Sequence, residues 1–358
     1  MRSISCEGTT SYEIGLQHGE QARDEIHGSL GFYRGLFKHD CSMTWEQVCQ
    51  TAVKFVPFLE TEFPRFVQEI RGIAQGANVD VESILALNVR TEIAYGMFND
   101  GCTALSWKHV DDSYLAQNWD WNAKQAPNLI SLHIRQPNPD TTTSSTTKPH
   151  IHMITEAGII GKIGLNSHGV GVTLNAIKSA GVEFNKLPCH LALRAALESP
   201  SRSDAVEMLC KYGVASACHI LVADETGGTG LECSANDIVQ LHMGDEGVEP
   251  VPGVVTHTNH FVHKHSGGAE SILYLPDSVP RLARIRELVA ACTSGPSLET
   301  VGDMLKDEQG YPTAICRVAT EKYPTETLFS IMMDLVARKA RVKIGRPVEP
   351  EEAFELSP

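Results

Sequence analysis

The sequence predicts an α+β fold in which β-sheets are covered by helices. Residues 13–100 have mostly helical periodicity, whereas short strands separated by Gly, Asn and Pro begin after residue 100. Strands, helices and strands again follow in separate blocks, which favours layered sheets over a regular strand–helix–strand repeat. With 358 residues, of which 42% are hydrophobic and 21% charged, the chain has a globular composition and can bury a large core.

The first hundred residues are expected to supply the first block of helices. Apolar residues recur there at three- and four-residue steps, which is typical of a helix that faces a core. This stripe consists of Phe63, Phe66, Val67, Ile70, Ile73, Ala74 and Ala77. Pro64 lies near its start, where the missing N–H is tolerated. A further helix is expected after Asp80, a candidate N-cap.

After residue 100 the sequence predicts strands interrupted by two pairs of helices. The predicted strands are 114–118, 129–135, 151–155, 159–163, 170–174, 220–223, 238–242, 254–257, 328–333 and 340–344. The predicted helices are 190–198, 204–212, 281–292 and 298–306. Residues 137–149 are rich in Thr, Ser and Pro and are expected to form an exposed loop between two strands.

Composition excludes several classes of function. The net charge is -14 and no dense basic run occurs, so nucleic acid is not expected as a partner. Neither a signal-peptide pattern nor a stretch of 18 apolar residues is present, so we expect a cytoplasmic protein without a membrane partner. The ten cysteines form no C-x-x-C pair, and most are expected to be buried small hydrophobes in a reducing compartment.

The dipeptide Gly101-Cys102 lies where the helical region gives way to strands. Glycine allows strained backbone geometry and close approach of a side chain to its carbonyl group. A cysteine directly downstream can attack that carbonyl, move the acyl group from nitrogen to sulfur and release the preceding segment by hydrolysis. Cys102 would then be a chain terminus whose α-amino group, with an ordinary pKa of about 7.7–8.0, can serve as the base for its own thiol.

Four further residues have the side chains that such a centre needs. Asp120 follows Cys102 by a distance that one strand pair can bridge, and its carboxylate would orient the new ammonium group. Asn175 and Asn259 are candidate oxyanion donors, and Arg317 is a candidate ligand for a substrate carboxylate. The alternative interpretations are that Asp120 is a carboxylate in a turn, that the two asparagines form turns and that Arg317 makes a salt bridge at the surface.

At these residues the chain resembles the fungal acyl-coenzyme A:isopenicillin N acyltransferases, relatives of the choloylglycine hydrolases in the N-terminal-nucleophile superfamily. The resemblance covers nearly the whole chain. Its motifs are Glu13-Ile14-Gly15, His18-Gly19, Arg71-Gly72-Ile73-Ala74, Arg90-Thr91-Glu92, Asp100-Gly101-Cys102-Thr103, Gln117-Asn118-Trp119-Asp120, Ile154-Thr155-Glu156-Ala157-Gly158-Ile159-Ile160-Gly161-Lys162, His257-Thr258-Asn259-His260, Ile315-Cys316-Arg317 and Gly345-Arg346-Pro347.

The resemblance implies a four-layer αββα sandwich formed as one domain from two chains. Residues 1–101 would be the helical leader that becomes an α chain, and residues 102–358 the catalytic β chain, with both held together as a heterodimer. It implies Cys102 as nucleophile, with Asp120, Asn175 and Asn259 as further catalytic residues. Arg317 would organise the site or bind a substrate carboxylate.

The activity implied is exchange or removal of an acyl side chain. Acyl-coenzyme A and isopenicillin N or 6-aminopenicillanic acid would be substrates, without a metal or prosthetic group. One departure concerns the C-terminal end. The penicillin-forming enzymes carry a peroxisomal signal of the Ala-Arg-Leu type, whereas this chain ends Leu-Ser-Pro, which favours a cytosolic or diverged paralogue.

Other interpretations remain open from the sequence. Within the same enzyme class, water can replace the amine acceptor, which gives an amidase of linear amides or peptides. A thiol enzyme with a separate histidine base and a non-catalytic ligand-binding paralogue are further alternatives. Four histidines within nine residues also suggest a zinc site, although the matching motif is missing. They are His257, His260, His263 and His265.

Overall fold

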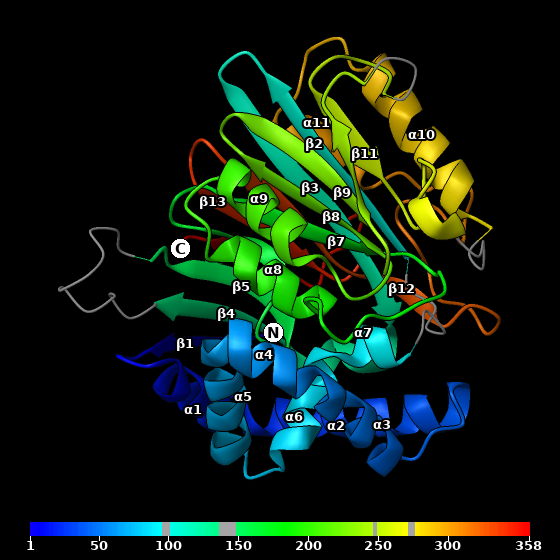
Figure 1. Cartoon of the computed structure of the whole chain (residues 1–358). Helices are drawn as coiled ribbons and strands as arrows, with labels where there is room; N and C mark the ends of the chain where they lie inside the picture. The colour runs from blue at the N-terminus through cyan, green and yellow to red at the C-terminus, as the bar shows by residue number, and fades with distance from the viewer. Residues whose placement is uncertain (95–100, 136–147, 246–248, 271–275) are drawn as a thin grey trace.

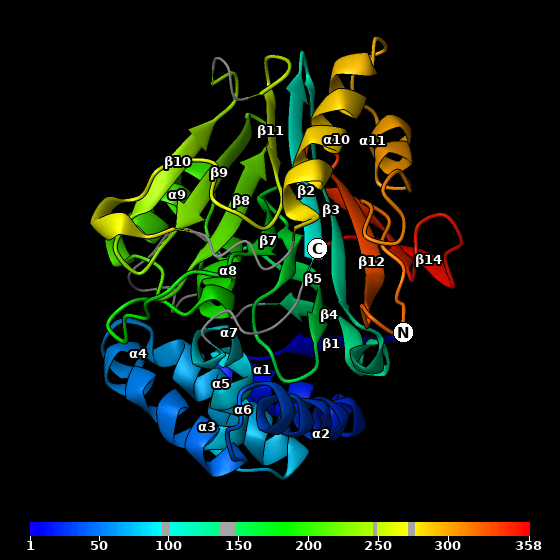
Figure 2. The same ribbon diagram turned by 90° about the vertical axis from the view of Figure 1, so that its right-hand side faces the viewer.

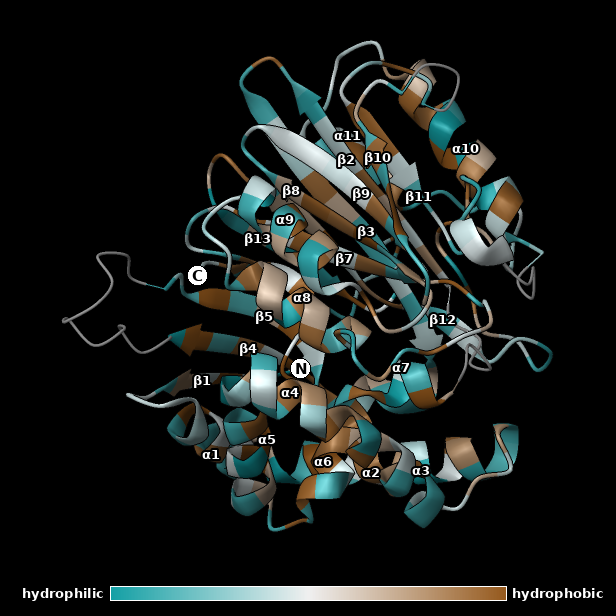
Figure 3. Ribbon diagram, in the orientation of Figure 1, coloured by the Kyte–Doolittle hydropathy of each residue, from teal (hydrophilic) through white to brown (hydrophobic). Residues whose placement is uncertain are grey.

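A computed structural model describes residues 1–94, 101–135, 148–245, 249–270 and 276–358. Two β-sheets face each other, helices cover their outer faces, and the N-terminal helices lie across one end (Figures 1 and 2). The predicted four-layer αββα sandwich is confirmed. Hydrophobic residues run along the central strands, whereas the peripheral helices alternate hydrophobic and polar residues (Figure 3). In the described part of the chain, no helix combines the length and apolar character that a membrane span needs.

The larger sheet has eight strands in the order β1-β4-β5-β6-β7-β8-β9-β10. Only its first pair, β1 with β4, is parallel among the described ladders. A strand of the N-terminal segment is therefore part of this sheet. The strands are β1 (Arg2–Glu7), β4 (Leu129–Arg135), β5 (Ile151–Glu156), β6 (Ile163–Asn166), β7 (Gly171–Ala176), β8 (Cys218–Asp224), β9 (Gly227–Cys233) and β10 (Ile238–His242).

The smaller sheet has six strands in the order β11-β2-β3-β12-β13-β14. Its described ladders are all antiparallel. In the β2–β3 ladder Gly101 lies opposite Asp120, and Cys102 lies opposite Trp119. The strands are β2 (Gly101–His109), β3 (Asp112–Asn122), β11 (Val254–His257), β12 (Thr325–Asp334), β13 (Lys339–Ile344) and β14 (Glu352–Leu356).

The N-terminal segment forms the helices that the periodicity predicts. The apolar stripe belongs to α5, and α6 begins directly after Asp80, although the Asp80 side chain makes no capping hydrogen bond. Helices α1 and α5 pack so closely that a Cβ at Gly19 would lie 2.3 Å from the carbonyl oxygen of Ile73. The helices are α1 (Ser11–Gln21), α2 (Arg23–Asp40), α3 (Trp45–Ala52), η1 (Val53–Phe55), α4 (Val56–Glu62), α5 (Pro64–Ala77), α6 (Val81–Asn88) and α7 (Arg90–Ile93).

The remaining helices form the two outer layers. Helices α8 (Cys189–Leu197) and α9 (Arg202–Tyr212) cover the larger sheet, while α10 (Ser278–Ala291) and α11 (Leu298–Met304) cover the smaller one (Figure 1). Two short turns of 3-10 helix, η2 (Ala123–Asn128) and η3 (Ser266–Gly268), complete the described elements.

The structure corrects one predicted strand. Of the predicted strand 159–163, residues 159–162 are not in a strand, and β6 begins only at Ile163. Side chains from other elements take up the backbone polar groups here: the amide of Ile160 donates to Asn88 Oδ1, and the carbonyl of Ile159 accepts from Thr155 Oγ1. Gly158 also has a φ of 92°, which ends the preceding strand in a turn.

The predicted loop at 137–149 lies mostly outside the described residues, which exclude 136–147. Its two flanking strands, β4 and β5, pair in an antiparallel ladder. Strand β9 was not predicted because three glycines obscure its pattern. A Cβ at Gly228 would lie 2.4 Å from Ser106 Oγ, and one at Gly230 would lie 2.6 Å from His219 Nε2. These glycines therefore make room for side chains of neighbouring strands.

Candidate active site

Cys102 is the second residue of β2 and is only 1% exposed. Alternation along the strand places its side chain in the hydrophobic interior with Ala104, whereas Leu105 belongs to the smaller cluster. Thr103, on the same outer face as Leu105, accepts a hydrogen bond from Arg281 of α10 over 3.1 Å. The candidate nucleophile therefore faces the space between the sheets, and its backbone can be reached from the outer layer.

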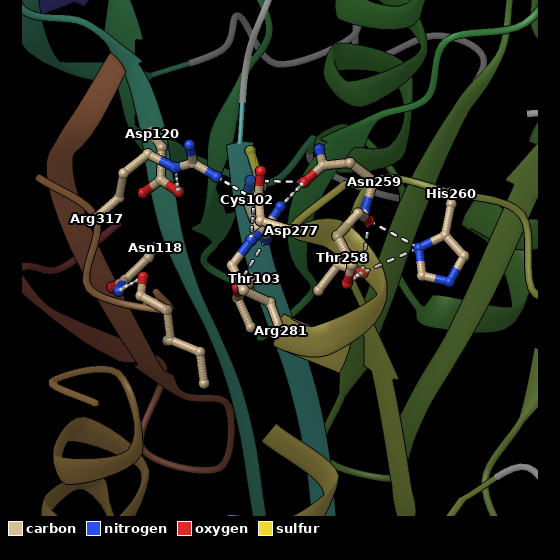
Figure 4. A network of polar contacts seen from close by, with 12 residues as sticks. Cys102, Thr103, Asn118, Asp120, Thr258, Asn259, His260, Asp277, Arg281 and Arg317 are labelled. Atoms are coloured by element: carbon tan, nitrogen blue, oxygen red, sulfur yellow. Dashed lines mark hydrogen bonds and ion pairs between the residues drawn. The ribbon is translucent and has the colours of Figure 1, made fainter. Parts of the chain in front are cut away.

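The backbone of Cys102 is held by Asn259 and Arg281 (Figure 4). Its nitrogen donates to Asn259 Oδ1 over 2.9 Å. Its carbonyl oxygen accepts from Arg281 Nη1 over 2.6 Å, and Arg281 Nη2 donates to the same Asn259 oxygen over 2.9 Å. The three residues thus form a closed set of contacts around the group that would become the amino terminus.

Asn259 is positioned by two contacts of its own. Its backbone nitrogen donates to Ser278 Oγ over 2.8 Å, and its Nδ2 donates to the carbonyl of Ala176 over 2.9 Å. Since Ala176 ends β7, the second contact joins the larger sheet to the loop after β11. With Nδ2 on Ala176, the amide oxygen is the atom directed at the nitrogen of Cys102.

Asp120 and Arg317 form a buried pair next to this set. Arg317 Nε lies 3.4 Å from Asp120 Oδ2, and Thr327 Oγ1 donates to Asp120 Oδ1 over 2.7 Å. Arg317 is 1% exposed, so it is not a surface residue. Burial raises the pKa of Asp120 to about 6, although the charges of Arg317 and Arg281 oppose the rise.

Asp277 connects the pair to the backbone of Cys102. Its Oδ2 accepts from Arg281 Nε over 2.8 Å and also pairs with Arg317 Nη2. The result is one network, Asp120–Arg317–Asp277–Arg281, that ends on Cys102 (Figure 4). The charges of the two carboxylates and the two guanidinium groups balance each other. A single unpaired charge buried here would destabilise the fold.

Gly101 allows the chain to approach the Asp120–Arg317 pair. A Cβ at this position would lie 2.9 Å from both Arg317 Nε and Asp120 Oδ2. Such a distance is shorter than normal van der Waals contact, so a side chain here would displace the buried ion pair. The requirement for glycine before Cys102 is therefore steric in this structure.

Asn175 lies on β7 and is fully buried. Its Oδ1 lies 3.0 Å from Nδ1 of His219, whereas its Nδ2 is buried and has no hydrogen-bond partner among the described residues. Gln117 of β3 bonds both backbone groups of Leu174, at 2.6 Å and 3.2 Å. Asn175 therefore follows a residue that is joined to the strand opposite Cys102.

Sequence reasoning assigned no role to Asp277, Arg281, Ser278 and Thr327. Arg281 and Asp277 carry no local signal, because they reach Cys102 and Arg317 only through the folded chain. Lys162 ends one of the motifs that carry the family resemblance, and it too was assigned no role.

Lys162 is fully buried, pairs with Glu156 and lies 3.8 Å from the centre of the Trp119 ring. Burial, with the nearby charge of Arg90, lowers its pKa to about 8, whereas the Glu156 carboxylate and, more weakly, Cys102 oppose the shift.

Two of the four histidines considered as a zinc site pair with acidic residues. His257 Nε2 lies 2.8 Å from Glu232 Oε1, and His265 Nδ1 lies 2.6 Å from Asp237 Oδ1. Within the ranges that the structure describes, no group of three or more His, Cys, Asp or Glu side chains is placed to hold a metal ion.

Comparison with known proteins supports the family that the motifs suggest. The family model described as acyl-coenzyme A:6-aminopenicillanic acid acyl-transferase matches residues 107–349. The chain is 38% identical over 361 residues to the acyl-coenzyme A:6-aminopenicillanic-acid-acyltransferase 40 kDa form of Emericella nidulans, and the match covers 100% of this chain and 96% of that relative.

Two solved structures are also similar. A variant of the conjugated bile acid hydrolase from Clostridium perfringens is 13% identical, with a TM-score of 0.47, over 72% of this chain and 92% of that one. Penicillin V acylase from Agrobacterium tumefaciens is 12% identical, with a TM-score of 0.48, over 72% of this chain and 86% of that one. The predicted family and enzyme class are confirmed by the sequence matches: the chain belongs to the acyl-coenzyme A:6-aminopenicillanic acid acyltransferase family.

Proposed function

We propose that the chain cleaves itself between Gly101 and Cys102 and then transfers acyl groups through the Cys102 thiol. The donors are acyl-coenzyme A and acylated β-lactams such as isopenicillin N, and the acceptor is an amine of the 6-aminopenicillanate type. The observation that carries the proposal is the hydrogen bond from the nitrogen of Cys102 to Asn259 Oδ1 over 2.9 Å. An amide oxygen at this point will accept equally from the amino group that cleavage creates.

In the proposed cleavage the Cys102 thiol adds to the carbonyl carbon of Gly101. The C–N bond breaks, the acyl group passes to sulfur, and the nitrogen of Cys102 takes up a proton. Water then hydrolyses the thioester, which leaves a Gly101 carboxylate and a free amine. Gly101 supports this step, because the lack of a side chain lets the backbone before Cys102 lie against the Asp120–Arg317 pair.

In each transfer cycle the new amino group takes the thiol proton, and the thiolate attacks the donor carbonyl. The departing amine or coenzyme A thiolate receives that proton. The amine acceptor then attacks the thioester, and Cys102 is regenerated. We assign oxyanion stabilisation to the amides of Asn175 and Asn259, orientation of the ammonium group to Asp120, and binding of a substrate carboxylate to Arg317. Coenzyme A enters as a leaving group.

The leader, residues 1–101, is proposed to stay bound as the α chain of a heterodimer with residues 102–358. Buried polar contacts across the cleavage point support this. Glu69 accepts two hydrogen bonds from Arg194, each of 2.8 Å, and Arg90 Nη2 donates to Glu156 over 2.6 Å. Strand β1 also pairs with β4 along six residues. Separation would expose these charges and a sheet edge, which makes dissociation costly.

We further propose that the enzyme acts in the cytoplasm on small molecules alone. Free thiols at Cys6, Cys189 and Cys218 fit a reducing compartment. The net charge of -14 gives no surface suited to nucleic acid.

The test is incubation of the purified protein with arylacetyl-coenzyme A and either isopenicillin N or 6-aminopenicillanate, followed by mass spectrometry of the products. A penicillin bearing the aryl-acetyl group is expected from the unaltered protein and none from Cys102→Ala. Cys6→Ala, which removes another buried thiol, serves as the matched control and should retain activity. Release of free arylacetic acid without any β-lactam product would instead show hydrolysis in place of acyl transfer and would favour the alternative in which water is the acceptor.

A further inference from the structure

Four buried polar side chains form a line that begins at Asn175 and continues through His219, His257 and Glu232. Asn175 on β7 and His219 on β8 are direct partners in the antiparallel ladder, so their side chains lie on the same face of the larger sheet. The ring of His219 stacks on that of His257 from the smaller sheet, with centroids 3.7 Å apart and planes at 15°. The line therefore crosses the interior between the two sheets.

The far end of this line is held firmly. His257 Nε2 lies 2.8 Å from Glu232 Oε1, and His257 Nδ1 lies 2.8 Å from the carbonyl oxygen of Thr258, so both ring nitrogens face acceptors. Glu232 also accepts from the backbone nitrogen of Val262 over 2.5 Å. Because the His257 ring is fixed at both nitrogens, the plane on which His219 stacks is fixed as well.

The His219 ring has little freedom of its own. It is fully buried, and its Nε2 occupies the space that a side chain at position 230 would fill, since a Cβ on Gly230 would lie 2.6 Å away. Burial, and secondarily the nearby His257, lowers the pKa of His219 well below its usual value, so the ring is neutral. A neutral imidazole has one N–H and one lone pair, and only Nδ1 has a hydrogen-bond partner among the described residues.

The backbone around Asn175 is fixed to the site from both sides. Leu174 is bonded by Gln117, two residues before Trp119, and Ala176 accepts from Asn259 Nδ2 over 2.9 Å. Asn175 thus lies between two anchors: strand β3, which pairs with the strand of Cys102, and Asn259, which accepts from the nitrogen of Cys102. Its buried Nδ2 makes no hydrogen bond in the described part of the chain, as expected of a donor kept for a ligand atom.

We propose that His219 is a positioning residue for acyl transfer: its Nδ1–H donates to Asn175 Oδ1 and so turns the Asn175 Nδ2 toward the oxyanion at the acyl carbon on Cys102. The proposal rests on the proposed function, in which Asn175 is an oxyanion donor. The opposite tautomer would accept from Nδ2 and turn the amide oxygen toward the developing negative charge. One proton on His219 thereby sets whether Asn175 stabilises or repels the oxyanion.

The experiment compares His219→Leu with His219→Asn in the processed enzyme. Leucine fills the space without a donor, whereas the Asn side-chain nitrogen can take the place of Nδ1. Release of coenzyme A from arylacetyl-coenzyme A is measured in the presence of 6-aminopenicillanate. We expect His219→Leu to lower kcat by about 10²-fold with KM nearly unchanged, as for loss of an oxyanion donor, and His219→Asn to recover most of the rate.

His133→Leu is the matched control, because His133 stacks on His152 with centroids 4.9 Å apart on β4, away from the network. It should keep the unaltered kcat. A stacking or packing role alone would make Asn and Leu at position 219 equally harmful, and that result would overturn the proposal, as would full activity of His219→Leu.

A double-mutant cycle separates this proposal from the proposed function. If His219 acts through Asn175, the double variant Asn175→Ala/His219→Leu should be no slower than Asn175→Ala alone. Additive losses would overturn the positioning role while leaving Asn175 as a donor. If Asn175→Ala retains full kcat, the assignment of Asn175 in the proposed function fails, and the positioning role of His219 fails with it. Activity of Cys102→Ala would instead reject the nucleophile itself.

Discussion

Asn259 accepts the backbone N–H of Cys102 through Oδ1 at 2.9 Å and is itself held by Arg281 and Ala176. The contact links the loop after β11 to the start of β2, which are 157 residues apart in the sequence. It places a neutral acceptor at the atom that the proposed mechanism uses as a base. The orientation of Cys102 therefore depends on a residue whose own amide has a partner at each end.

Removing this acceptor should impair catalysis. Asn259→Leu leaves the N–H of Cys102, Nη2 of Arg281 and the carbonyl oxygen of Ala176 without their partner. We expect a loss of kcat of about 10²-fold, as for other single polar groups at such centres. Steady-state release of coenzyme A checks this. Asn236→Leu, at an exposed turn, is the control. Equal rates for Asn259→Leu and the control would show that the contact plays no part.

A side chain at position 101 should slow self-cleavage. Gly101→Ala introduces a Cβ at 2.9 Å from both Arg317 Nε and Asp120 Oδ2, so the pair or the strand must move. Because misplacement by about 1 Å can cost about 10²-fold in rate, cleavage should be slower by about that factor. The fraction of cleaved chain is followed on denaturing gels after synthesis. Cleavage of Gly101→Ala at the unaltered rate would contradict the steric account.

The stability of the protein should depend on pH through Asp120. Burial raises the pKa of this carboxyl group from 3.8 to about 6, so the folded state binds the proton more tightly than the unfolded state. Its contribution to stability is full below pH about 4 and is lost as the pH rises through about 6, a change of about 3 kcal/mol in the free energy of unfolding.

Asn at position 120 cannot ionise and should lack this dependence. Urea unfolding of Cys102→Ala is compared with that of Cys102→Ala/Asp120→Asn at several pH values between about 4 and 7, since both chains are expected to stay in one piece. The stability of the first should fall relative to the second across this range. Curves that run parallel from pH 4 to 7 would mean that Asp120 does not titrate there.

We predict that the buried ion pair between Glu69 and Arg194 holds the leader, residues 1–101, to the rest of the protein. Glu69→Ala leaves the buried guanidinium of Arg194 without two hydrogen bonds, and we expect a loss of about 3–5 kcal/mol in the free energy of unfolding. Arg71→Ala removes an exposed pair with Glu60 and should cost at most about 1 kcal/mol. Thermal denaturation and co-elution of the two pieces in gel filtration are measured. Losses of the same size in both variants would argue against the buried pair as an anchor.

Much of the fold could be predicted from the sequence because its signals are local. The apolar stripe of α5 has the period that burial of one helix face produces, and the strands β4, β10 and β11 contain runs rich in Ile, Val and Leu. Strand β9 was not predicted, because its glycines make room for neighbouring side chains and interrupt the apolar pattern of the strand. Residues 159–163 were predicted as a strand from their apolar run, but Asn88 and Thr155 take up their backbone groups instead.

The candidate site likewise contains residues that the sequence predicts and residues that it does not. Cys102, Asp120, Asn259 and Arg317 stand at strand ends or in compact motifs, and the fold brings them into one network. Arg281 was not predicted as a site residue, because it lies on a helix of ordinary composition and is 179 residues from Cys102 in the sequence. The pairing of Asn175 with His219 depends on strand register, which sequence alone does not fix.

The most direct test of the self-processing account is intact-mass and N-terminal analysis of the purified, catalytically active protein. We predict two tightly associated chains, one of residues 1–101 and one of residues 102–358, with Cys102 as the first residue of the larger and a free α-amino group on it. Full activity from a single uncleaved chain, in which the nitrogen of Cys102 is still an amide, would contradict the account.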